Sequence, residues 1–201
     1  MKLISVYTIL LITILLNYSC GEKEPEPKGD SEYIAEVEKW HKNRVIRLKT
    51  ETGWLNLVGL YWLKEGDNTF GSSKDNDIVF PQNAPAHIGI LTLKDSTVKM
   101  VVNDGINIFH KGQPVTELEL KPDVLGDPTI LDIGTLRWYI IERSKGFGIR
   151  LRDLESTFVK EFTHIDRFPI RDDWNVNARF EAYNPPKVIS IPTVLGDVVE
   201  E

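Results

Sequence analysis

The chain has 201 residues, of which 41% are hydrophobic, and a formal net charge of −6. This length and apolar content are enough to bury the core of one domain. Basic residues are interspersed with acidic ones, so the chain lacks the concentrated basic face that binding to a nucleic-acid backbone requires. The composition therefore predicts no nucleic-acid partner.

An apolar run over residues 3–16 follows a basic start at Lys2. The run is shorter than the roughly 20 residues of a membrane-spanning helix, so residues 1–19 are predicted to form a cleaved signal peptide. Cys20 is the only cysteine. An internal disulfide and a cysteine-based metal site are therefore excluded.

The Ser19-Cys20 pair resembles the bacterial lipobox, in which the cysteine becomes a lipidated N-terminus. Asn17 stands where that motif usually has leucine, one place after Leu16. The resemblance implies a lipid anchor on Cys20 and a place in the cell envelope, at the outer membrane, on its periplasmic or surface-exposed side. A simple secretory signal and an uncleaved anchor are the alternatives. Residues 20–30 are charged and rich in proline, which predicts a flexible tether.

An amphipathic helix is predicted over about 31–50. Apolar residues recur there at steps of three and four, and Asp30 or Ser31 can cap its start. Gly53 is a plausible end. The helix is expected to lay its apolar stripe on the domain, with partner binding as the alternative.

Short strand candidates separated by turn residues fill the chain after Gly53. They lie at 69–70, 78–80, 87–93, 97–102, 106–110, 115–120, 135–142, 147–152, 157–162, 176–183 and 187–191. In 147–152 the apolar and polar residues alternate, which is typical of an antiparallel strand with one wet face. The pattern predicts a mainly β fold, an antiparallel sandwich or open barrel preceded by the helix, in a single domain over 31–195 with a tail at 196–201.

Two stretches resemble the bacterial domain-of-unknown-function family 1684. The first is GWL at 53–55 with VGLYWL at 58–63, EG at 65–66, FG at 70–71 and DIVFP at 77–81; the second is GIRLRD at 148–153 with FPI at 168–170 and WNVNARF at 174–180. The resemblance covers roughly residues 35–195 and brings no established activity. Members of this family normally continue into a second half, so the resemblance implies a truncated or short variant in which a site built from both halves is incomplete.

Residues 66–87 are also similar to the start of a forkhead-associated phosphothreonine-binding domain. Gly71, the run 76–80 and His87 carry this likeness. In those domains an arginine and a serine hold the phosphate, and Ser72 and Ala84 stand at these positions here. Without the guanidinium, phosphopeptide recognition is not expected, and the likeness implies only sandwich geometry.

Catalytic motifs are scarce. The sequence has no serine-nucleophile elbow, phosphate loop, zinc-protease helix motif or dinucleotide glycine pattern. On a strand, His164 and Asp166 would share a face, and with nearby arginines they define the alternative function, a hydrolase-type enzyme. A third metal ligand is not visible, so no metal and no cofactor are predicted. Asp172 and Asp173 beside Arg171 indicate a charged loop.

The preferred hypothesis is a non-enzymatic envelope lipoprotein domain that binds a ligand or a partner through its β-surface. Trp54 and Trp62 are expected either to anchor the core or to line an open groove. Arg150, Arg152 and Arg179 lie on predicted polar faces and would form an anion-binding surface if their strands are neighbours; cross-strand ion pairs are the alternative. The hypothesis predicts a crevice lined by aromatic or arginine side chains, without a converging acid, base and nucleophile.

Overall fold

The computed structural model describes residues 26–192 and 198–200, which fall into two compact units. The helical unit comprises 26–42 with 165–179, and the sandwich unit comprises the rest. The predicted signal peptide and Cys20 lie outside the described residues, and the single domain over 31–195 stays a prediction. No helix in the described part of the chain is long and apolar enough to cross a membrane.

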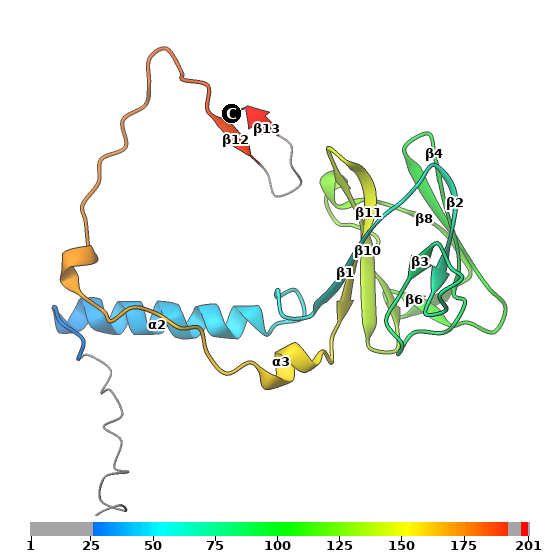
Figure 1. Cartoon of the computed structure of the whole chain (residues 1–201), viewed down its shortest axis with the longest axis horizontal. Coiled ribbons are helices and arrows are strands. Elements are labelled where there is room, and N and C mark those ends of the chain that lie inside the picture. The colour runs from blue at the N-terminus through cyan, green and yellow to red at the C-terminus, as the bar shows by residue number, and fades with distance from the viewer. Residues whose placement is uncertain (1–25, 193–197, 201) are drawn as a thin grey trace, which may run out of the picture. The chain divides into compact units, whose positions relative to one another are not determined.

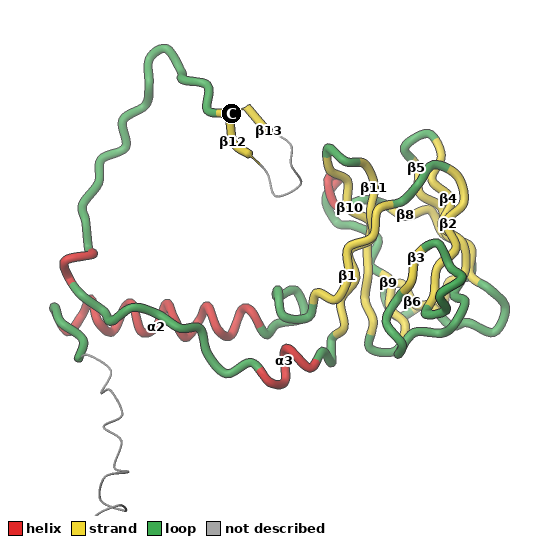
Figure 2. Tube along the Cα trace, viewed as in Figure 1, coloured by secondary structure: helices red, strands yellow, loops and turns green. Residues whose placement is uncertain are grey.

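Two large β-sheets form the sandwich of this unit (Figures 1 and 2). The six-stranded sheet has the order β1 (Leu57–Trp62), β11 (Gly146–Asp153), β10 (Leu136–Arg143), β9 (Leu131–Ile133), β6 (Ile108–His110) and β7 (Gln113–Val115). The five-stranded sheet has the order β3 (Ile78–Val79), β2 (Gly66–Gly71), β4 (Gly89–Lys94), β5 (Thr97–Val102) and β8 (Glu117–Leu120). Their pairs are antiparallel except for β2 with β3. The predicted mainly β, antiparallel sandwich is confirmed.

Aromatic rings join the two sheets in the core. Phe70, Phe80 and Trp138 are at most 2% exposed, and their ring centroids lie 5.6–6.2 Å apart. Tyr61 stacks on Phe80 at 5.7 Å, and burial raises the pKa of its phenol. Aliphatic side chains fill the rest of the core. In β5, for example, every second residue is buried, as expected for a strand with one inward face.

The expected role of Trp54 as a core anchor is wrong. Its side chain is 72% exposed, in the loop between α2 and β1. Trp62 is half-buried, and it is not one of the core residues. The register explains this, because Tyr61 lies opposite the buried Ile149, so Trp62 falls on the other face of the sheet.

Helices account for one correct and one wrong prediction. α2 spans Ser31–Leu48, close to the predicted range, and none of its residues is buried. Residues 157–162 were expected to form a strand, but α3 covers Thr157–Glu161. The Ser156 hydroxyl caps it, accepting a hydrogen bond from Phe158 N at 3.2 Å. Helical turns also occur at η1 (Asp123–Leu125) and η2 (Asp172–Trp174).

The last strand candidates are confirmed only in part. Residues 176–183 form no strand and pair with none of the described strands. The candidate at 187–191 overlaps β12 (Ser190–Pro192), which pairs with β13 (Val198–Glu200). This two-stranded ladder is separate from both sheets of the sandwich.

Asp123 is expected to make stability depend on pH. Arg143 Nη2 donates to its carboxylate at 2.7 Å, and this hydrogen bond lowers the pKa of Asp123. The stabilisation is therefore complete above the usual carboxyl pKa and is lost as pH falls through the lowered value. We expect Asp123→Asn to cost about 1 kcal/mol near neutral pH and close to nothing in strong acid. Urea unfolding of both proteins near neutral pH and in strong acid measures this difference in cost. An equal cost of Asp123→Asn at the two pH values would contradict the prediction.

Candidate functional site

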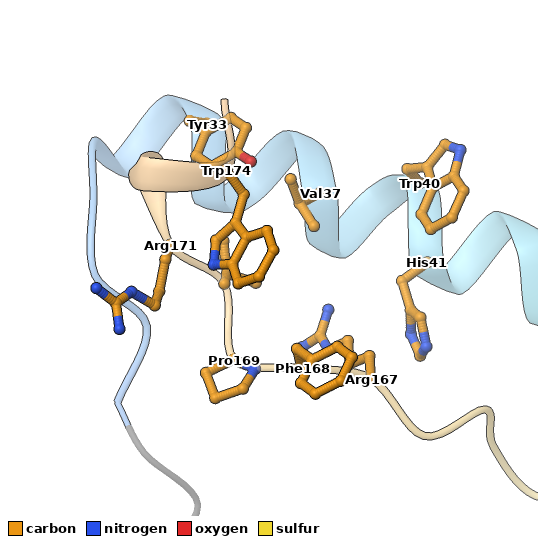
Figure 3. Close-up of a pocket in the computed structure, with 10 residues that line it drawn as sticks. Tyr33, Val37, Trp40, His41, Arg167, Phe168, Pro169, Arg171 and Trp174 are labelled. Carbon is orange, nitrogen blue, oxygen red and sulfur yellow. The ribbon is translucent and has the colours of Figure 1, made fainter. Parts of the chain in front are cut away.

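A hollow of about 180 Å³ lined by aromatic and arginine side chains lies in the helical unit, and not on the β-surface where a binding crevice was expected (Figure 3). We call it the aromatic pocket. Its lining residues come from α2 and from the segment after α3: Tyr33, Val37, Trp40, His41, Arg167, Phe168, Pro169, Ile170, Arg171 and Trp174.

One face of α2 forms the first wall. Tyr33, Val37, Trp40 and His41 are spaced by four, three and one residues, so they project from the same side of the helix. Trp40 remains 54% exposed. The helix thus presents a ready-made apolar stripe in this unit.

The second wall is the segment 165–174, which is irregular except for the turn η2 and is tied to the helix by polar contacts. Arg167 Nη2 donates to Glu38 Oε1 at 2.6 Å, and His41 Nε2 lies 3.0 Å from the carbonyl oxygen of Ile165. Ile170 is 5% exposed, and its carbonyl accepts a hydrogen bond from Lys28 N at 2.9 Å. These contacts hold the segment against the N-terminal half of α2.

Two stacked rings stand at the mouth of the pocket. The centroids of Phe168 and Trp174 lie 6.5 Å apart, with an interplanar angle of 15°. They are 84% and 69% exposed, which is unusual for rings of this size. Exposed aromatic rings rimmed by polar residues are typical of binding sites.

The charges around the pocket are largely neutralised within the unit. Arg167 is paired with Glu38, and Arg171 Nε donates to Asp173 Oδ2 at 3.1 Å. The hydrogen bond from Arg171 lowers the pKa of Asp173. The lining contains no carboxylate, serine, threonine or cysteine, and its polar side chains are those of Tyr33, Trp40, His41, Arg167, Arg171 and Trp174.

Of the three arginines predicted to form an anion-binding surface, only Arg150 is both on a strand and partly exposed. Arg150 is half-buried on β11, and its Nη1 lies 3.5 Å from the hydroxyl of Tyr139 on β10. Arg152 is 8% exposed instead of lying on a wet face, because it donates to the carbonyl oxygen of Gly53 and to Asn56 Oδ1. Arg179 lies in the helical unit, outside any strand, so the structure does not add it to this surface.

The predicted pair of His164 and Asp166 lacks the strand on which it depends. Residues 163–170 have no regular secondary structure, and the two residues belong to different units. His164 Nδ1 lies 2.8 Å from Thr163 Oγ1. Nowhere in residues 26–192 or 198–200 do three metal-ligating side chains gather.

Trp62 and Trp54 are on the surface of the sandwich unit. The indole of Trp62 covers Gly148, where an added Cβ would lie 3.0 Å from ring atom Cε3, and Lys145 Nζ lies 5.4 Å from the ring centroid. Trp54 instead lines a second hollow at the end of α2. The two residues therefore do not line one groove.

Comparisons with known proteins leave the family open. No protein-family model matches the sequence, and no curated protein is significantly similar to it. Among solved structures, the matches include the FHA domain of FhaA complexed with the intracellular domain of Rv3910, an FHA domain from an analysis of phosphothreonine-dependent interactions, and the Rv0020c FHA structure. Each is 17% identical with a TM-score of 0.32, covering 46% of this chain and 86%, 81% and 78% of the respective structures. Such values carry no argument about ligands, and the sandwich assignment rests on the strands themselves.

Ser72 and Ala84 occupy the positions at which forkhead-associated domains hold the phosphate, and here they contact each other. The Ser72 hydroxyl donates to the carbonyl oxygen of Ala84 at 2.8 Å, and Ala84 is 8% exposed. Neither residue offers a charged donor to a phosphate.

Proposed function

We propose that this chain is a non-enzymatic, lipid-anchored protein of the cell envelope whose aromatic pocket receives an aromatic side chain of a protein partner. The observation that carries the proposal is the exposed, stacked pair of Phe168 and Trp174 over an apolar hollow.

The size of the pocket favours a side chain over a larger ligand. Its volume of about 180 Å³ is below the roughly 300–1,000 Å³ of a drug-sized site. A single aromatic anchor that fills a small pocket is typical of the central residue in a protein interface. Because Arg167 and Arg171 are already paired with carboxylates, an apolar ring is favoured over a small organic acid.

Sequence alone supports the remaining parts of the proposal. Cys20 and the apolar run before it suit a lipid anchor, and the motifs at 53–81 and 148–180 suit membership of family 1684. The hydrolase alternative relied on His164 and Asp166 sharing a strand face, and residues 163–170 have no regular secondary structure.

Titration with N-acetylphenylalanine amide, a stand-in for a partner side chain, tests the pocket. With the full chain in neutral detergent, we expect the indole NMR signals of Trp40 and Trp174 to shift, and those of Trp54 and Trp62 to stay in place. Phe168→Ala or Trp174→Ala should weaken binding about tenfold, which corresponds to about 1.4 kcal/mol of lost contact.

Trp54→Ala is the matched control, because Trp54 is as exposed as Trp174 but lies outside the pocket. It should leave the affinity for the amide unchanged. Equal loss in the Trp54 and Trp174 variants would show that the amide binds exposed indoles nonspecifically, and the proposal would then be wrong.

A further inference from the structure

A second hollow lies within the sandwich unit, at the C-terminal end of α2. Its volume is about 370 Å³, and its polar lining consists of Arg44, Arg47, Thr50 and Thr52, with Trp54 at one side. We call it the Arg44–Arg47 hollow. Its volume falls in the range of small-molecule sites.

The charge of this region is opposite to that of the chain. Residues 43–54 contain Arg44, Arg47 and Lys49 and one acidic residue, Glu51, which is paired with Arg137, in a chain with a net charge of −6. Lys49 Nζ donates to the carbonyl oxygen of Phe162 at 2.7 Å. Among the described residues, no carboxylate pairs with Arg47, so its guanidinium can meet an anion from outside.

The end of a helix normally repels anions, because its last carbonyl oxygens point outward. Here these oxygens already have donors. Ile46 O accepts from Lys49 N at 3.1 Å, Arg47 O accepts from the Thr50 hydroxyl at 2.8 Å, and Leu48 O accepts from Leu55 N at 3.3 Å. These three oxygens therefore have partners within the chain and do not point unpaired into the hollow.

The remaining lining adds specific contacts. The hydroxyl of Thr52 can donate to an anion, and the indole of Trp54 is 72% exposed beside the arginines. Guanidinium groups bind phosphate through paired N–H donors, which makes arginine the usual residue for recognising a phosphate group.

We propose that the Arg44–Arg47 hollow binds a phosphate ester, with the two guanidinium groups on the phosphate and the Trp54 indole against the attached organic group. This site is independent of the aromatic pocket and shares no residue with it. A lipid headgroup and a soluble phosphate ester offer the same chemistry.

Calorimetric titration of the full chain in neutral detergent tests the proposal. The probes are glycerol 3-phosphate for a soluble ester and dihexanoylphosphatidylglycerol for a lipid headgroup. We expect at least one to bind, and the tighter one identifies the source. Arg44→Gln or Arg47→Gln should weaken binding about tenfold, since a hydrogen bond to a charged group is worth at least about 1.5 kcal/mol. The double variant should fall about a hundredfold, or below detection.

Lys74→Gln combined with Lys94→Gln is the control for net charge, because both lysines are exposed elsewhere in the sandwich unit. It should keep the affinity within about twofold, and thermal unfolding should show that all variants are folded. Absence of binding by both probes would overturn the proposal. So would an equal loss in the arginine and lysine double variants, because it would reduce the effect to net charge.

Discussion

Trp138→Ala is expected to lower the free energy of unfolding of the sandwich unit by about 3–5 kcal/mol. The indole is fully buried, and it contacts Phe70 and Phe80 edge-on at 6.2 and 5.7 Å. These two rings come from the other half of the sandwich, on β2 and directly after β3, so the truncation opens a cavity where both sheets meet. Neighbouring side chains in a packed core collapse only partly into such a cavity.

Urea unfolding monitored by circular dichroism measures this loss, with two variants for comparison. Trp54→Ala removes an equally large ring from the surface and should change stability by less than about 0.5 kcal/mol. Trp138→Phe should cost less than half as much as the alanine variant. It keeps a ring and removes an indole N–H for which the described residues provide no acceptor. Comparable losses for Trp54→Ala and Trp138→Ala would contradict the assignment of the core.

Individual strands were predictable where apolar and polar residues alternate within one short stretch of the sequence. Alternation in 147–152 predicts an antiparallel strand with Ile149 and Leu151 inward, and both are fully buried on β11. The sequence says less about which face of the sheet an aromatic side chain occupies, because a shift of one residue in register moves it to the other face. Trp62 is an example, since its neighbour Tyr61 takes the inward position.

The aromatic pocket was not predictable from the sequence, because its walls are more than 120 residues apart in the chain. His41 and Ile165 lie in contact although they are separated by 124 positions. The one available signal was the stripe of Tyr33, Val37 and Trp40 on α2, which indicates that something covers this helix face. The sequence does not say that residues 167–174 cover this face, since the segment is irregular apart from the short turn η2 and has no periodicity to read.

Arg152 was expected on the exposed face of its strand and is buried instead. Its replacement is the second large effect that we expect. Arg152→Met should destabilise the chain by about 2–4 kcal/mol. The apolar stem is kept, but Gly53 O and Asn56 Oδ1 lose their buried donor. Asn56 is 1% exposed and donates to the carbonyl oxygens of Thr50 and Glu51 at 3.0 and 2.6 Å. The Arg152 guanidinium, acting through Gly53 and Asn56, therefore helps to hold the loop between α2 and β1.

Arg150→Met is the matched control, because Arg150 lies two residues away on the same face of β11 and its hydrogen bond to Tyr139 is long, at 3.5 Å. Its cost should stay below about 1 kcal/mol. The loop held by Arg152 also carries Thr52 and Trp54, which line the Arg44–Arg47 hollow. Arg152→Met should therefore weaken phosphate binding as well as lower stability, whereas Trp138→Ala should lower stability alone at temperatures where the protein stays folded. If Arg152→Met leaves phosphate binding intact, the loop is held by other contacts and the coupling is absent.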